Sequence, residues 1–143
     1  MVRQASAWVE SPLQMLCAVE AHHAGLLGPG TVVVPRAGLR PLRATRKELR
    51  RLDLPDGLTL AEPRERMPRR VQAVGDAFSG KVQVRWLASA PGHIVVVDDG
   101  LATLRLLELL AGGPFRPLLR ARATPARARA RLGLAAALRL RLS

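Results

Sequence analysis

Short apolar runs alternate with longer stretches of mixed polarity along this chain, and the alternation predicts its secondary structure. Strands are expected where aliphatic and β-branched residues gather, at residues 5–10, 31–35, 57–61, 71–74 and 93–97. Helices are expected where apolar residues recur at helical spacing, at residues 11–24, 39–52, 79–88, 101–110 and 127–142. Because successive strands are joined by long connections, a parallel sheet is favoured. We therefore predict an α/β fold: a Rossmann-like parallel sheet of about five strands with helices on both faces, plus an Arg-rich C-terminal helical tail.

The clearest helix start is the segment Ser11-Pro12-Leu13-Gln14. Ser11 can cap the helix, Pro12 fits its first position, and Gln14 stands where a capping box has Glu or Gln. We expect this helix to stop at Gly25, where a left-handed conformation ends helices. The side expected to pack on the sheet consists of Leu13, Leu16, Cys17 and Ala21.

The net charge of +12 is concentrated in the last part of the chain. Residues 1–115 hold 15 basic and 11 acidic side chains, whereas residues 116–143 hold eight arginines and no acid. Apart from Lys47 and Lys81, every basic residue is Arg, a bias that a GC-rich genome also produces. We predict a Rossmann-like domain over residues 1–115, and a basic helical tail or interdomain connection over residues 116–143.

Metal and membrane signals are weak in this sequence. The single cysteine, Cys17, cannot form an internal disulfide, and the three histidines do not have the spacing of metal ligands, so neither a metal nor a cofactor is expected. No run of apolar residues is long enough for a membrane span, and the first residues do not resemble a signal peptide. A cytoplasmic location is therefore the default prediction.

The triplet Asp98-Asp99-Gly100 directly follows the strongest strand signal and is the first candidate for chemistry. One carboxylate at the end of a strand can face a ligand and accept a proton, while Gly100 permits close approach of a substrate. The alternative is that Asp98 or Asp99 only caps the following helix.

Two further loops carry polar side chains after predicted strands. Residues 75–80 include Asp76, Ser79 and Gly80, which could bind a polar ligand at a helix start. Ser11 and Gln14 follow the first strand, although capping alone explains both. These loops do not match the spacing of phosphate-binding or dinucleotide-binding motifs.

Taken in order, three segments carry a family resemblance: residues 10–21, residues 75–80 and residues 95–104. Together they resemble the amino-terminal portion of actinobacterial proteins grouped with the bacterial polysialyltransferases and lipooligosaccharide sialyltransferases. The acidic-acidic-Gly triplet at Asp98 is the most specific match. The resemblance covers about residues 5–115.

The resemblance implies a GT-B glycosyltransferase, in which two Rossmann-like domains face each other across a cleft. In such enzymes Asp98 or Asp99 would be the catalytic base that deprotonates a glycan acceptor, and CMP-sialic acid would be the donor. The substrate-binding residues implied are Ser11, Pro12, Gln14, Asp76, Ser79, Gly80 and Gly100. The chain contains no His-Pro dipeptide of the donor-binding half. We therefore expect a truncated or split transferase half that is inactive alone and partners a separately encoded donor-binding domain.

Two other hypotheses stay open at this point. The basic tail could attach the domain to nucleic acid or to an anionic membrane surface, although no nucleic-acid motif is present and no specific nucleic-acid partner is expected. The chain could also be a gene remnant without a function.

Overall fold

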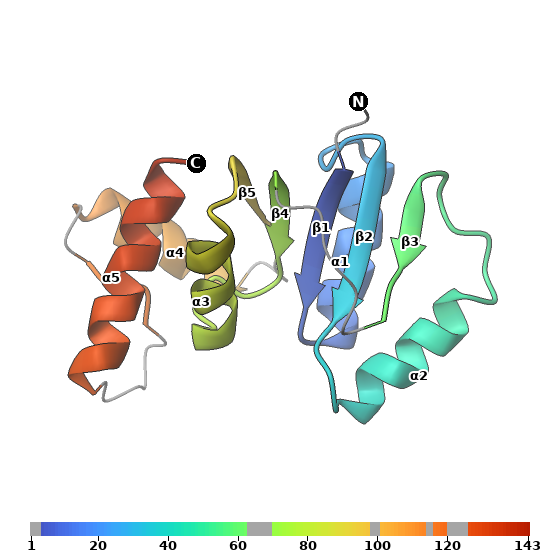
Figure 1. Ribbon diagram of the computed structural model, residues 1–143, viewed down its shortest axis with the longest axis horizontal. Helices are drawn as coiled ribbons and strands as arrows, with labels where there is room; N and C mark the ends of the chain where they lie inside the picture. The colour runs from blue at the N-terminus through green and yellow to red at the C-terminus, as the bar shows by residue number, and fades with distance from the viewer. Residues whose placement is uncertain (1–3, 63–69, 98–100, 114–115, 120–125) are drawn as a thin grey trace.

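The computed structural model describes residues 4–62, 70–97, 101–113, 116–119 and 126–143, and its centre is one parallel sheet. The strands are β1 (Gln4–Val9), β2 (Gly30–Pro35), β3 (Leu58–Leu60), β4 (Val71–Val74) and β5 (His93–Val96). They lie in the order β3-β2-β1-β4-β5, and every pairing is parallel (Figure 1). This confirms the predicted Rossmann-like fold class.

The strand order reverses between β1 and β4. From β1 the chain moves outward through β2 to β3, and it then returns to the other side of β1 to form β4 and β5. Ala5 is therefore paired with Thr31 on one side and with Val71 on the other. All carboxyl ends lie at the lower edge in Figure 1.

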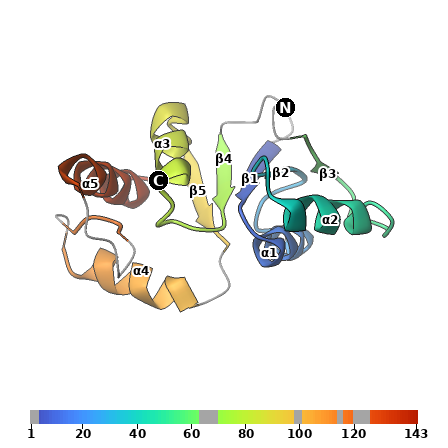
Figure 2. The ribbon, with the colours of Figure 1, turned by 90° about the horizontal axis from the view of Figure 1, so that it is seen from below.

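The helices cover both faces of this sheet, as predicted. They are α1 (Pro12–His23), α2 (Arg40–Leu49), α3 (Gly80–Ser89), α4 (Leu101–Ala111) and α5 (Arg127–Arg141). Helices α1 and α2 lie on one side of the sheet and α3 on the other, with α5 next to α3 (Figure 2). The expected helix and strand bounds are correct to within a few residues.

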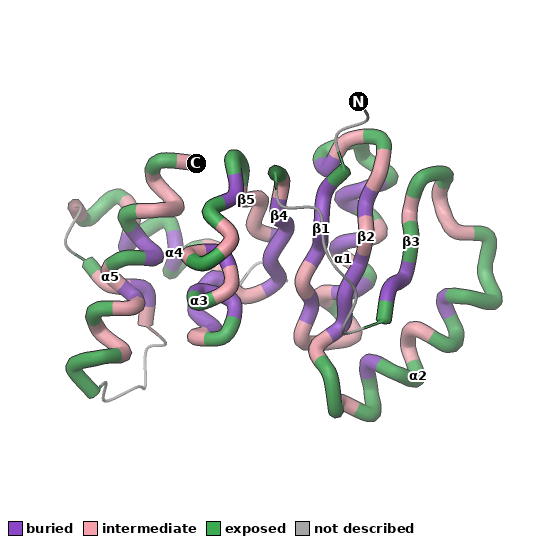
Figure 3. Tube along the Cα trace, viewed as in Figure 1, coloured by how far each residue is buried: buried purple, intermediate pink, exposed green. Residues whose placement is uncertain are grey.

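Two hydrophobic clusters hold these layers together, and they use different side chains (Figure 3). The first joins the α1 face of the sheet to α1 and α2 and consists mainly of small or aliphatic residues such as Ala7, Val33 and Leu42. The second joins α3, α4 and α5 around Trp86, which is 0% exposed. Burying each large apolar side chain contributes roughly 1.5–3 kcal/mol, so both clusters stabilise the fold.

The buried side of α1 differs from the prediction. Leu13 and Leu16 are 49% and 44% exposed, whereas the buried residues of this helix are Met15, Ala18, Ala21 and His22. Apolar side chains occur all around α1, so spacing alone did not identify the packed face. Small residues face β1 because the helix lies close to the sheet, and His22 is accommodated there by hydrogen bonds to the Thr31 hydroxyl and the Asp56 carbonyl.

The arginine-rich helix α5 is part of the same folded unit. Its Gly133 lies against Leu118, where an added Cβ would come within 2.8 Å of the Leu118 carbonyl oxygen. Arg139 donates to the carbonyl of Pro91, and Arg141 donates to the carbonyls of Leu110 and Gly113. These arginines satisfy carbonyl groups of the α/β core.

Candidate ligand-binding site

The point where strand order reverses is where open α/β sheets bind ligands, because the loops on either side of it diverge and leave room at the carboxyl edge. Here that point lies between β1 and β4. Glu10 and Ser11 follow β1, and Gly75 and Asp76 follow β4. The predicted binding residues Ser11 and Asp76 therefore leave neighbouring strands at the same edge of the sheet.

The junction between β1 and α1 is closed by its own side chains. The Ser11 hydroxyl accepts a hydrogen bond from the Gln14 N–H at 3.2 Å, and Oε1 of Gln14 accepts one from the Glu10 N–H at 2.8 Å. The expected cap is confirmed, with one difference: Gln14 reaches the N–H of Glu10 rather than that of Ser11. Pro12 occupies the first position of α1.

The two junctions touch through Gly75. A Cβ added at this glycine would lie 2.3 Å from Oε1 of Gln14, well inside van der Waals contact. The missing side chain therefore lets Gln14 lie against the backbone that follows β4. A larger residue at this position would have to displace the Gln14 side chain from its hydrogen bond to the Glu10 N–H.

A partly buried ion pair lies at the same edge and was not predicted. The Glu10 side chain is 10% exposed, and its Oε2 accepts a hydrogen bond from Arg36 at 2.6 Å. Its Oε1 is buried without a hydrogen-bond partner in the described part of the chain. The sequence carried a signal for this ion pair, because a charged residue directly follows each of two paired strands: Glu10 follows β1 and Arg36 follows β2. The Arg36 N–H bonds to the Val9 carbonyl, which holds the two residues side by side.

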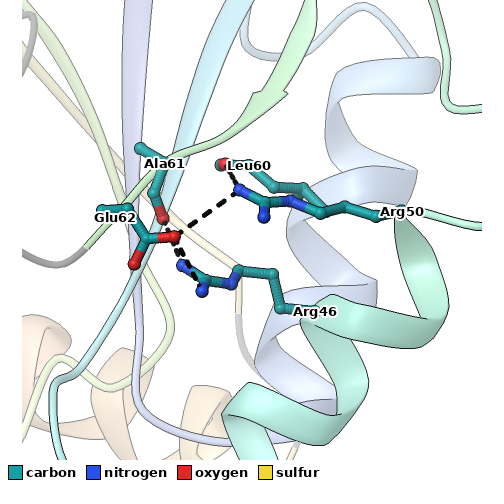
Figure 4. Close-up of polar contacts among 5 residues, drawn as sticks. All are labelled: Arg46, Arg50, Leu60, Ala61 and Glu62. Atoms are coloured by element: carbon teal, nitrogen blue, oxygen red, sulfur yellow. Dashed lines mark hydrogen bonds and ion pairs between the residues drawn. The ribbon is translucent and has the colours of Figure 1, made fainter.

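The end of β3 is closed in a similar way by two arginines of α2 (Figure 4). Arg46 donates to the Ala61 carbonyl and Arg50 to the Leu60 carbonyl, at 3.1 and 3.0 Å. Both also face the Glu62 carboxylate, which lies 2.8 Å from Arg46. The hydrogen bond from Arg46 lowers the pKa of Glu62 below its usual value.

The junction between β4 and α3 is different because the side chain of its N-cap residue does not cap the helix. Asp76 turns the chain by accepting a hydrogen bond from the Phe78 N–H at 2.8 Å. Ser79 is the N-cap residue of α3, but its hydroxyl makes no capping hydrogen bond, and the first turn holds no acidic residue. The first N–H groups of a helix have no partner within it, so this helix start is open to a ligand.

A cavity of about 340 Å³ lies at this open helix start. Three cationic side chains from different elements line it: Arg36 after β2, Lys81 in the first turn of α3, and Arg129 of α5. Of the described residues, Phe78, Ser79, Gly80 and Leu119 also line it. We call this space the α3 cavity.

Arg129 is held firmly in the wall of the α3 cavity. Its guanidinium donates to the Phe78 carbonyl and to Oε1 of Gln83, both at 2.7 Å. Gln83 is 0% exposed and donates in turn to the carbonyls of Ala77 and Leu118. The positive charge of Arg129 is thus fixed beside Gly80, where an added Cβ would lie 3.3 Å from its Nε.

A larger groove of about 540 Å³ runs between α3 and the neighbouring face of the sheet. Trp8 lies in its wall with the guanidinium of Arg85 over the indole ring, 3.7 Å from the ring centre. Burial lowers the pKa of Arg85. Lys81 lines both this groove and the α3 cavity, so the two spaces meet at its side chain.

The predicted catalytic triplet Asp98, Asp99 and Gly100 lies outside the described residues. The residue before it, Val97, is buried, and its N–H bonds to the Val74 carbonyl at 2.9 Å. Val97 therefore lies beside the end of β4 at the carboxyl edge.

Comparison of the chain with models of known protein families, with curated proteins and with solved structures gave no match. Within the described ranges, no cluster of three or more His, Cys, Asp or Glu side chains is arranged to hold a metal ion. None of the described helices combines the length and the apolar character that crossing a membrane requires.

Proposed function

We propose that this domain is the acceptor-side half of an inverting glycosyltransferase of the sialyltransferase type. It binds a glycan at the carboxyl edge between β1 and β4, and a second Rossmann-like domain holds the CMP-sugar donor across the cleft. The observation that supports this most is the direct contact between the β1–α1 and β4–α3 junctions through Gly75 and Gln14.

The proposed chemistry uses one carboxylate of the triplet after β5. Asp98 or Asp99 accepts the proton of an acceptor hydroxyl, whose oxygen attacks the anomeric carbon of the donor sugar. The bond from that carbon to the CMP phosphate breaks, and its electron pair leaves with CMP. The transfer needs a base and a positioned acceptor.

The binding residues fall into two groups. Asp76, Ser79 and Gly80 surround the open helix start and are the groups with which an acceptor sugar is proposed to make contact. Ser11 and Gln14 already bond to the main chain, and they shape the site by fixing the β1–α1 loop. Pro12 contributes the same kind of support as the first residue of α1.

The alternative of a basic nucleic-acid or anionic-surface module is favoured less by the contacts of α5. Of the five arginines of this helix, Arg129, Arg139 and Arg141 donate to core carbonyls or to Gln83. These three side chains are held against the folded core and are only partly exposed, which leaves Arg127 and Arg131 as the exposed arginines of the helix.

Glycan binding by the purified chain tests the proposal. We expect weak, saturable retention on an array of oligosaccharides, measured without phosphate in the buffer. Asp76→Ala should abolish this retention, and Arg51→Ala, an exposed position of the α2 end, should not change it. Absence of glycan binding, or equal binding by Asp76→Ala, would contradict the proposal.

A further inference from the structure

The α3 cavity has the features of an anion site, and they come from independent parts of the fold. Arg36, Lys81 and Arg129 bring positive charge from three elements that are far apart in the sequence. The uncapped start of α3 adds N–H groups and the positive end of a ten-residue helix. A dianion entering this cavity meets donors on several sides.

The acidic groups near the cavity do not cancel this charge. Glu10 pairs with Arg36 through one oxygen and offsets one of the three cations. Asp76 accepts from the Phe78 N–H and keeps its own negative charge. Three cations and these two carboxylates leave a net charge of +1 among these described residues, and the positive end of α3 adds to it, which favours an anionic ligand.

We propose that the α3 cavity binds the phosphoryl group of a small organic phosphate. Phosphate oxygens suit this cavity because Arg129 supplies a fixed positive charge in its wall, Lys81 a mobile point charge, and the helix start a row of N–H groups. This inference rests on the proposed function in one respect: both place a ligand at the carboxyl edge between β1 and β4.

The neighbouring groove indicates why an ester should bind better than inorganic phosphate. It meets the cavity at Lys81 and offers the Trp8 indole with the polar side chains of Gln72 and Ser89. An organic group extending from the phosphoryl group past Lys81 can bury apolar surface there. Sugar phosphates and nucleoside monophosphates share this chemistry.

Lys81 permits a clean test because the chain has only one other lysine, Lys47. Labelling the protein with [¹⁵N]lysine gives two backbone amide signals. The Lys81 amide lies in the first turn of α3 at the cavity, and the Lys47 amide lies on α2. Titration with inorganic phosphate, a pentose phosphate and a nucleoside monophosphate should move the Lys81 signal saturably and leave that of Lys47 in place.

The matched variants are Lys81→Gln and Lys47→Gln, which remove the same charge from two exposed positions. Loss of one charge-assisted contact should weaken phosphate binding about tenfold in Lys81→Gln, with no change in Lys47→Gln. Circular dichroism checks that both variants stay folded. Stronger binding of the pentose phosphate than of the nucleotide would assign a sugar phosphate, and the reverse order a nucleotide.

Three results would overturn the proposal: equal shifts of both lysine signals, reproduction of the shifts by sodium chloride at matched ionic strength, or binding of inorganic phosphate without binding of any ester. Because this titration contains no glycan and the array contains no phosphate, either proposal can fail while the other stands.

Discussion

The two strand-to-helix junctions where the strand order reverses, β1–α1 and β4–α3, differ in how the N–H groups at the helix start find hydrogen-bond acceptors. At β1–α1, Ser11 and Gln14 satisfy N–H groups of the loop and the helix start from within the chain. At β4–α3 Asp76 accepts from the Phe78 N–H of the loop, but the N-cap residue Ser79 makes no side-chain cap bond, and cations line the cavity at the helix start. The first junction therefore serves stability, and the second is the place where a ligand can supply the missing acceptors.

The largest effect is expected at the arginine that ties α5 to the open junction. Arg129→Ala removes hydrogen bonds to the Phe78 carbonyl and to fully buried Gln83. Leaving buried acceptors unpaired should lower the free energy of unfolding by about 3 kcal/mol. Urea denaturation measures this, with Arg131→Ala on the exposed side of α5 as the matched control. A similar loss in both variants would show that the Arg129 contacts are not specific.

The contact between the two junctions should be next in size. In Gly75→Ala the new Cβ forces Gln14 away and breaks its bond to the Glu10 N–H. We expect a loss of about 2 kcal/mol, a cap bond plus local strain. The double variant with Gln14→Ala should be no less stable than Gly75→Ala alone, because the clash is then removed. Additive losses in urea denaturation would contradict the packing described for Gly75.

The N-cap residues of α1 and α3 are both serines, Ser11 and Ser79, so the two helix starts can be compared with the same substitution. Ser11→Ala removes the cap of α1 and should cost about 1 kcal/mol. Ser79→Ala removes no capping bond, so its cost should stay below about 0.5 kcal/mol. Thermal unfolding of the two variants side by side measures the difference. Equal losses would mean that the α3 start is capped after all.

The smallest effect is expected in how the free energy of unfolding depends on pH through the ion pair of Arg46 and Glu62 after β3. Because Arg46 lowers the pKa of Glu62 in the folded protein, this carboxylate contributes stability above its unfolded pKa of 4.5. The contribution is lost as the pH falls below that value and the group is protonated. The stability difference between wild type and Arg46→Gln should therefore shrink in urea titrations at acidic pH. A difference that is constant across this range would contradict the role of Glu62.

Much of the fold was predictable from local patterns. The aliphatic runs ending at Val34 and Val97 mark parallel strands, of which β2 is mostly buried and the edge strand β5 only partly. Ser11 with Pro12 marks a helix start without tertiary information. The face of α1 was not predictable, because Leu13 and Leu16 are as apolar as the residues that are buried. The packing of α1 on the sheet determines its buried face, which holds Met15 and His22 as well as two alanines.

The candidate site was predictable in place but not in detail. Its position follows from the strand order, which brings Ser11 and Asp76 to one edge. The cations that line the α3 cavity could not be placed from the sequence. Arg36 pairs with Glu10, which follows the neighbouring strand. Arg129 lies beside Gly80 although it is 49 positions later in the chain, in a helix for which the sequence indicated no packing partner. Contacts between distant segments are determined by packing of α5 on α3.

Hydrogen–deuterium exchange of the backbone amides, with and without a saturating pentose phosphate, tests most directly whether the open helix start is the binding site. The account predicts slower exchange at Gly80, Lys81 and Val82, whose N–H groups would bond to the ligand, and no change in the first turn of α1. Protection in α1 or α2, or unchanged exchange at α3, would contradict it.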